Sequence, residues 1–208
     1  TSALSNRRRR RLDKAEVRTL REFVLLAARN ETKTARDRAL LDCMLFAGLR
    51  CAEAATLKTG DVRPEAGRWW LVVTGKGQKT RKIKVHDTLY KSLATWAEHA
   101  GLALGAGDLP IFCNLTKAGK PTGNPLDSSV IGRLVAEYGN RAGLAPLHGE
   151  NRLAPHDLRR TCARNAYENG AKLPQIQALL GHSDVKTTMI YIGADDNPDD
   201  TAIDYVRY

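Results

Sequence analysis

A histidine and an arginine at the start of an expected helix, His156 and Arg159, are the first residues that could do chemistry. Because they are three residues apart, they lie on the same face of a helix. The free backbone N–H groups and the dipole of a helix N-terminus favour a bound anion such as a phosphate. Taken alone, the pair is explained more simply as a capping histidine and a solvated arginine, so other stretches must decide.

Three further stretches hold basic, acidic or phenolic side chains that could act on a phosphate. Arg50 lies at a second expected helix start, with Glu53 in the first turn, where a carboxylate suits the helix dipole or pairs with a base. His182 occupies the tight gap between two expected helices, and Tyr191 follows nine residues later on the last helix. Lys76 lies between two glycines at the tip of an expected hairpin. Each residue alone is usually structural or solvated, but their joint occurrence in this order is distinctive.

With these residues in this order, the chain resembles the tyrosine recombinases, which are site-specific recombinases of the phage-integrase type. The resemblance runs from about residue 12 to residue 193, which corresponds to the catalytic domain of that family. It is carried by five motifs, namely Gly48-Leu49-Arg50, Gly75-Lys76-Gly77-Gln78-Lys79-Thr80-Arg81, His156-Asp157-Leu158-Arg159, Leu180-Gly181-His182 and Thr187-Thr188-Met189-Ile190-Tyr191.

The resemblance implies that Arg50 and Arg159 clamp the scissile phosphate of DNA. It also implies that His156 shares this clamp, that His182 is the second histidine of the family, and that Glu53 takes a supporting acidic position. Physical chemistry agrees, because a phosphodiester is anionic and the charge on its non-bridging oxygens must be stabilised before attack. A planar guanidinium binds two oxygens at once and suits that task better than an ammonium group.

The resemblance further implies that Tyr191 is the nucleophile and that Lys76 is the hairpin lysine of the family. A tyrosine hydroxyl has a pKa of about 10 and needs a base or a strongly positive pocket to attack phosphorus. The departing 5′ oxygen needs a proton, which a lysine on a flexible tip can deliver. The expected intermediate is a 3′-phosphotyrosine, so strand transfer and religation need no ATP. No cofactor is expected, and no carboxylate cluster resembles a metal site.

The elements that must position these residues indicate a mainly α protein with a small antiparallel β-sheet or hairpin, an α+β arrangement. Apolar residues recur at helical spacing, and alternation across a Gly-Lys-Gly-Gln turn predicts the hairpin. Asp13 with Glu16, and also Ser183, are expected helix caps. The expected helices span 12–29, 34–47, 51–57, 88–99, 128–141, 157–169, 174–180 and 183–192, and the expected strands span 69–74 and 82–85.

Charge is divided unevenly along the chain, whose net charge is +10. Residues 1–21 carry eight basic and two acidic side chains, whereas residues 192–208 carry five aspartates and one arginine. We therefore expect a basic linker or arm at 1–11, a catalytic domain at 12–193 and a C-terminal tail at 194–208. A basic body favours a polyanionic partner, here double-stranded DNA. The resemblance adds a homotetramer on DNA that exchanges C-terminal tails, and an N-terminal DNA-clamping domain outside this sequence.

Composition excludes several other classes of protein. With 42% hydrophobic and 27% charged residues, the chain is not generally disordered. Its longest apolar stretches are far shorter than the roughly 18 residues of a membrane helix, and charged residues interrupt any signal peptide. The spacing of the cysteines fits neither a metal site nor a disulfide framework, which favours reduced cysteines in a cytoplasmic protein of a bacterium, phage or mobile element. These are Cys43, Cys51, Cys113 and Cys162.

Three alternative functions stay open. A type IB topoisomerase-like enzyme would use a similar pocket to relax supercoiled DNA as a monomer. A non-catalytic DNA-binding relative would keep the fold, although all six pocket positions are retained. A zinc or magnesium hydrolase built on His156, His182 and Asp157 has no matching ligand spacing. No motif specifies the target site, the host element or the choice between integration, excision and resolution.

Overall fold

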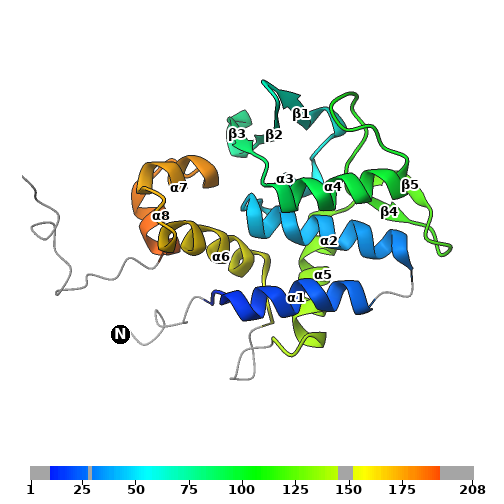
Figure 1. Cartoon of the computed structure of the whole chain (residues 1–208), viewed down its shortest axis with the longest axis horizontal. Coiled ribbons are helices and arrows are strands. Elements are labelled where there is room, and N and C mark those ends of the chain that lie inside the picture. The colour runs from blue at the N-terminus through cyan, green and yellow to red at the C-terminus, as the bar shows by residue number, and fades with distance from the viewer. Residues whose placement is uncertain (1–9, 28–29, 145–151, 193–208) are drawn as a thin grey trace, which may run out of the picture.

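The computed structural model describes residues 10–27, 30–144 and 152–192, and its mainly helical fold with small antiparallel sheets confirms the predicted class (Figure 1). Most of the expected linker and the whole expected tail lie outside the described residues, so the domain division stays a prediction. The α-helices are α1 (Lys14–Ala27), α2 (Glu31–Phe46), α3 (Cys51–Ala55), α4 (Asp87–Ala100), α5 (Ser128–Arg141), α6 (Pro155–Glu168), α7 (Leu173–Leu180) and α8 (Val185–Ile192). The strands are β1 (Val62–Glu65), β2 (Arg68–Thr74), β3 (Thr80–Lys84), β4 (Cys113–Leu115) and β5 (Pro121–Pro125), with 3₁₀ turns η1 (Thr59–Asp61) and η2 (Lys76–Gln78).

Local side-chain hydrogen bonds set where the first two helices begin. At α1, the N–H of Glu16 donates to Oδ1 of Asp13 at 2.8 Å, and the N–H of Asp13 donates to Oε2 of Glu16 at 2.9 Å. This reciprocal pair is the predicted capping box. Helix α2 begins three residues earlier than predicted, because the side chain of Asn30 accepts the N–H of Lys33 at 2.9 Å and caps the helix.

The predicted hairpin forms the larger part of a three-stranded antiparallel sheet in the order β1-β2-β3. In the pairing of β2 with β3, Leu71 lies opposite Ile83 and Val73 lies opposite Arg81. Leu71, Val73 and Ile83 are buried. Because side chains alternate along a strand, Arg81 lies on the same inward face as Ile83.

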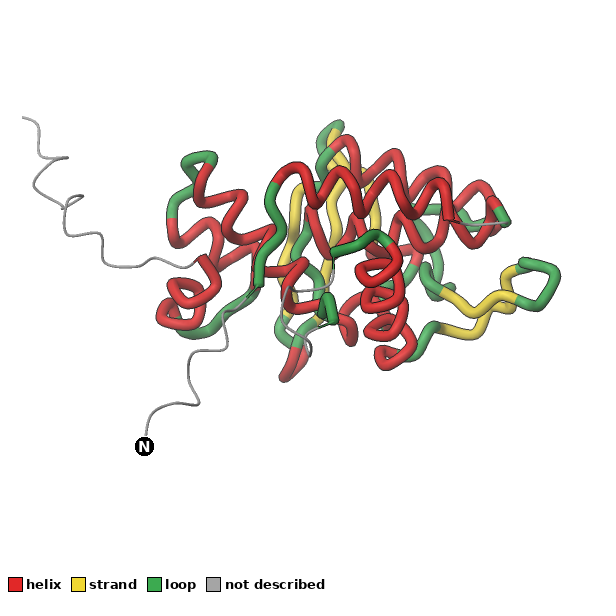
Figure 2. The backbone as a smooth tube through the Cα atoms, turned by 90° about the horizontal axis from the view of Figure 1, so that it is seen from below, coloured by secondary structure: helices red, strands yellow, loops and turns green. Residues whose placement is uncertain are grey.

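Strand β1 and the β4–β5 pair were not predicted. The glycine and proline around 60–64 favoured a loop, but β1 is an edge strand paired only with β2, and an edge strand tolerates a proline. Strand β5 has the sequence Pro-Thr-Gly-Asn-Pro, in which every residue type except threonine is depleted in strands. It pairs with β4, and the N–H of Leu126 just after it donates to the carbonyl of Phe112 at 2.9 Å. Figure 2 shows this hairpin projecting from one end of the molecule.

The main core surrounds α2, whose residues from Ala35 to Leu45 are all buried except Arg38. Helix α4 packs along it and contributes the fully buried Trp96, whose Nε1 donates to the carbonyl of Ile111 at 2.7 Å. In Figure 1, α2 runs between α1 and α4. A central helix of this kind fixes the loop that follows it, and that loop carries Arg50.

Helices α6, α7 and α8 pack together around a smaller core at the end of the molecule opposite the β4–β5 hairpin (Figures 1 and 2). Its buried members are Ala163, Ile176, Leu180 and Ile192. Helix α8 begins at Val185, and Asp184 rather than the predicted Ser183 accepts the N–H of Lys186, at 2.9 Å. This packing brings the turn between α7 and α8 next to α6.

Candidate active site

A cavity of about 370 Å³ opens where the N-terminal ends of α3, α5 and α6 converge. Its lining includes Arg50 just before α3, Ser128 and Ser129 at the start of α5, and His156 and Arg159 near the start of α6. Three of the predicted site residues, from two distant parts of the sequence, therefore share one cavity. The N-terminal ends of the two longer helices add a partial positive charge that favours an anion there.

Arg159 is the most buried of the predicted site residues whose side chains the structure describes, with only 1% of it exposed. Its Nη1 donates to the carbonyl of Gly48 and its Nη2 donates to the carbonyl of Leu180. Its Nε is buried without a hydrogen-bond partner among the described residues. Burial first, and then the nearby Arg50, lower the pKa of Arg159 below the usual arginine range. A buried cation with an unused donor is stabilised when an anion enters the cavity.

Glu53 holds the arginines together from the buried side of the cavity. Its carboxylate accepts Nη1 of Arg50 at 2.7 Å and the backbone N–H of Arg50 at 2.8 Å. It also accepts Nη1 and Nη2 of Arg81 at 2.8 and 2.9 Å, while Nη1 of Arg159 lies 3.8 Å away. Burial alone would raise the pKa of Glu53, but the hydrogen bonds from the two arginines outweigh it and lower the pKa to about 2. Glu53 is therefore ionised at neutral pH.

The turn between α7 and α8 places His182 against the ring of Tyr191. The two ring centroids are 4.9 Å apart and the rings meet edge to face. Nδ1 of His182 lies 3.1 Å from Oγ1 of the buried Thr188, a contact that orients the imidazole. Burial first, and then the neighbouring arginines, lower the pKa of His182 to about 4, so its ring is neutral at pH 7.

The hydroxyl of Tyr191 lies 3.0 Å from Nδ1 of His156. In the tautomer with its proton on Nε2, His156 accepts the hydroxyl proton at Nδ1. Burial first, and then Arg160 and Arg159, lower the pKa of His156, which keeps the ring neutral and able to accept that proton. The guanidinium carbon of Arg160 lies 5.4 Å from the centre of the Tyr191 ring and adds positive charge beside the hydroxyl-bearing side chain.

Lys76 lies in the short 3₁₀ turn between β2 and β3, where the sequence placed it. Its side chain falls outside the described part of the structure, so its role stays a prediction. The base of this turn is closed by the N–H of Gly75, which donates to the carbonyl of Lys79 at 2.8 Å. The next strand is tied to α7, because Nε of Arg81 donates to the carbonyl of Leu179 at 2.8 Å.

Arg81, like Arg160, is a residue of this site for which the sequence predicted no role. It was noted only as the last residue of the hairpin motif, yet its side chain is 11% exposed and reaches Glu53. The alternation of side chains along β3 could have indicated its inward position. Because Ile83 faces inward, Arg81, two residues earlier, lies on the inward face as well. A charged residue on the buried face of a strand needs a partner and so points to a polar site.

The described residues offer little support for a metal site, a reactive thiol or a membrane-spanning helix. There, no three or more His, Cys, Asp and Glu side chains are grouped so that they could hold a metal ion. All four cysteines are free; three are buried, and burial raises the pKa of Cys162 to about 12. No helix in the described ranges has both the length and the apolar character needed to cross a membrane.

Comparisons of sequence give a consistent result. The sequence model of the Phage integrase family matches residues 10–197. Tyrosine recombinase XerD of Staphylococcus haemolyticus is 34% identical over 158 residues, which are 75% of this chain and 49% of that protein. Tyrosine recombinase XerC of Escherichia coli O157:H7 is 32% identical over 166 residues, which are 80% of this chain and 51% of that protein. The chain thus spans about half the length of these curated relatives.

Solved structures share the fold. The XerH site-specific recombinase, in a post-cleavage complex with palindromic difH substrate, superposes with a TM-score of 0.74 at 25% identity, covering 95% of this chain and 53% of that chain. The XerA recombinase gives a TM-score of 0.70 at 25% identity, covering 95% of this chain and 66% of that chain. Because the family match spans α1 to α8 and includes Arg50, Arg159 and Tyr191, the chain belongs to the phage integrase family, the tyrosine recombinases.

Proposed function

We propose that this chain is the catalytic domain of a site-specific DNA recombinase or integrase that acts on double-stranded DNA. The observation that carries the proposal is the Tyr191 hydroxyl, held 3.0 Å from His156 beside a cavity walled by Arg50 and Arg159. The related XerH structure is a post-cleavage complex with its DNA substrate, which supports cleavage chemistry in this fold. The curated relatives are bacterial proteins, and we place this one with the DNA in the bacterial cytoplasm.

In the proposed cleavage step, the phenolic oxygen of Tyr191 bonds to phosphorus and the bond from phosphorus to the 5′ oxygen breaks. His156 takes the phenol proton, and Lys76 gives a proton to the departing 5′ oxygen. Arg50 and Arg159 stabilise the charge on the non-bridging oxygens. The product is a 3′-phosphotyrosine and a free 5′ hydroxyl.

Religation reverses this step with the 5′ hydroxyl of another strand. That hydroxyl attacks phosphorus and gives its proton to Lys76, while the bond from phosphorus to Tyr191 breaks and His156 returns the proton to the phenol. One phosphodiester is exchanged for another through the phosphotyrosine, so the strand is resealed without ATP. The same residues serve both directions, with His182 packed against the tyrosine ring and Glu53 holding Arg50.

The test is covalent capture of DNA. The full-length protein is incubated with a pool of nicked suicide duplexes of randomised sequence in the presence of a chelator, and covalent adduct is scored after denaturation. Wild type should form adduct, and Tyr191→Phe should form none while binding DNA nearly as well, since only the attacking oxygen is removed. Tyr167→Phe is the matched control, because that tyrosine is exposed on α6. Adduct that persists in Tyr191→Phe would place the nucleophile elsewhere.

The proposed role of Lys76 as the general acid is tested by comparing two DNA substrates. Lys76→Ala should slow cleavage of ordinary DNA strongly, because the 5′ oxygen must leave without a proton. The defect should be much smaller on a duplex with sulfur at the 5′ bridging position, since a thiolate leaves without protonation. Lys79→Ala, three residues along the same hairpin, is the control. Equal defects of Lys76→Ala on both duplexes would remove the general-acid role.

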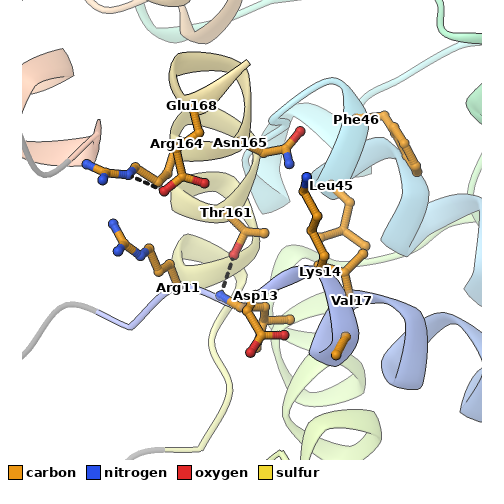
Figure 3. Close-up of a pocket in the computed structure, with 12 residues that line it drawn as sticks. Arg11, Asp13, Lys14, Val17, Leu45, Phe46, Thr161, Arg164, Asn165 and Glu168 are labelled. Atoms are coloured by element: carbon orange, nitrogen blue, oxygen red, sulfur yellow. Dashed lines mark hydrogen bonds and ion pairs between the residues drawn. The ribbon is translucent and has the colours of Figure 1, made fainter. Parts of the chain in front are cut away.

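We further propose a homotetramer on DNA in which the tail at 194–208 of one subunit docks on a neighbour. A cavity of about 610 Å³ between the start of α1, the end of α2 and α6 is a suitable receptor (Figure 3). Its wall carries the positive charges of Arg11, Lys14 and Arg164 against the negative charges of Asp13 and Glu168, which leaves an excess of positive charge, and Val17 and Leu45 give it an apolar surface. The tail has matching residue types: its aspartates at 195–200 suit the positive side chains of the cavity, and its apolar residues at 202, 203 and 206 suit the apolar ones.

A further inference from the structure

Arg81 connects three separate parts of the site through one side chain. It starts from β3, the strand that follows the turn carrying Lys76, and its Nη1 and Nη2 donate to the two oxygens of Glu53 at 2.8 and 2.9 Å. Its Nε donates to the carbonyl of Leu179 in the last turn of α7 at 2.8 Å. All three nitrogens of the guanidinium therefore have a partner, and none of these partners is solvent.

The end of α7 depends on arginines for its unpaired carbonyls. The last carbonyls of a helix have no partner within the helix, and they carry the negative end of its dipole. Arg81 binds the carbonyl of Leu179 and Arg159 binds the next one, that of Leu180. Gly181 follows with a φ of 64° and lies against the Arg81 side chain, where an added Cβ would be 3.0 Å from Cδ. Arg81 therefore supports the turn that leads to His182.

Charge gives Arg81 a second effect on the cavity. Glu53 is the carboxylate that faces both clamp arginines, and an anionic carboxylate competes with a phosphate for the same guanidinium groups. With both of its oxygens bound by Arg81, Glu53 accepts Nη1 and the backbone N–H of Arg50 and stays 3.8 Å from Nη1 of Arg159. Without Arg81, the carboxylate would have Arg50 and Arg159 as its remaining charged partners, and its single negative charge would offset part of their positive charge.

From this geometry we propose that Arg81 is a positioning residue of the cleavage site, which holds Glu53 and the end of α7 so that Arg50 and Arg159 keep free donors for the scissile phosphate. Arg81 touches neither phosphate nor tyrosine in this scheme. The inference rests on the proposed function, because it assigns the clamp to Arg50 and Arg159.

The test compares single-turnover adduct formation at saturating full-length protein with the dissociation constant for the same nicked duplex. Arg81→Ala should slow adduct formation by roughly 10- to 100-fold, the range for a supporting partner of a polar site, while the dissociation constant changes little. Arg81→Lys should give an intermediate rate, because one ammonium cannot bind two carboxylate oxygens and a carbonyl together.

A double variant separates positioning from simple stability. If freed Glu53 competes for the clamp, Arg81→Ala with Glu53→Gln should cleave faster than the product of the two single defects predicts. Arg21→Ala is the matched control, because Arg21 also binds a buried carboxylate through two nitrogens, that of Asp42 at 2.7 and 3.1 Å, but in the α1–α2 packing. This control should lose stability and keep its cleavage rate per folded molecule.

Three results would overturn the inference. The first is a normal cleavage rate in folded Arg81→Ala. The second is an equal loss of cleavage rate in Arg21→Ala and Arg81→Ala when the two variants have the same thermal stability. The third is a double variant whose cleavage defect equals the product of the two single defects. Failure of the proposed function looks different, because wild type would then form no adduct, or Tyr191→Phe and Arg50→Ala would form as much as wild type. If those two variants lose adduct and the Arg81 variants behave as wild type, only the positioning role is wrong.

Discussion

At the residue scale, positive neighbours and burial keep both histidines of the site neutral. Burial is the largest effect on each ring, and the arginines around the cavity come next. Neutral rings can accept a proton from a tyrosine, which a charged imidazolium cannot. When a phosphate enters, its negative charge offsets the arginines, so DNA binding itself should raise the proton affinity of the site.

The low pKa of His182 predicts a pH dependence of folding. Its folded pKa of about 4 lies below the value of about 6.5 for a free histidine, so the unfolded chain binds more protons between these values. The stability that neutral His182 contributes is complete above about pH 6.5 and is lost as the pH falls towards 4. In urea denaturation between pH 7 and 4.5, wild type should therefore lose more unfolding free energy than His182→Gln. Parallel pH profiles would contradict the shift.

At the element scale, the turn between α7 and α8 carries His182 and is held at its start by Arg81 and Arg159. Gly181 adopts a φ of 64°, and the space beside it is filled by Arg81, with Nη1 3.2 Å from where a Cβ would lie. A side chain here meets both backbone strain and a collision, because the left-handed region favours glycine. The exact path of this turn decides where His182 meets Tyr191.

Gly181→Ala should therefore lower stability by about 1–3 kcal/mol and slow adduct formation, because the added methyl displaces Arg81 and the turn. Gly170→Ala is the control: its φ of 87° gives comparable backbone strain, but nothing lies within 4 Å of an added Cβ. Chemical denaturation and single-turnover cleavage of both variants check this. If Gly170→Ala slows cleavage as much as Gly181→Ala, strain alone explains the effect.

At the scale of the whole molecule, the small α6–α8 core carries the nucleophile and ends beside the cavity of Figure 3. Arg164, which lines that cavity, donates from Nη1 to the carbonyl of Ile192 in the last turn of α8. A tail docked on a neighbour would therefore act on the helix that bears Tyr191. Coupling of assembly to cleavage would follow from this proximity.

Truncation after Asn197 should change adduct yield on paired, synapsed sites more than on single sites, because only assembled subunits can exchange tails. Lys14→Glu should reproduce part of this effect, since it turns an attractive cavity wall into one that repels the aspartates of the tail. Recombination assays on one-site and two-site duplexes measure it. A truncated protein that cleaves and recombines as the intact one does would leave the tail without a regulatory role.

Local sequence determined most of the elements. The capping box of Asp13 and Glu16, the helical spacing of apolar residues and the Gly-Lys-Gly-Gln turn all act between near neighbours, so they hold before any tertiary packing exists. The motifs around Arg50, Arg159 and Tyr191 could be recognised for the same reason. Each depends on a short run of residues at a helix end.

Only the tertiary structure decided which partners these residues meet. His156 contacts Tyr191, which is 35 positions away in the sequence. Arg81 binds Glu53, which is 28 positions away. Each pair joins two separately packed elements. The β4–β5 pair formed against the strand propensity of its residues, because the paired strands satisfy each other's backbone groups. No spacing rule covers such contacts, since they depend on how helices and strands dock, and docking is set by the whole buried core.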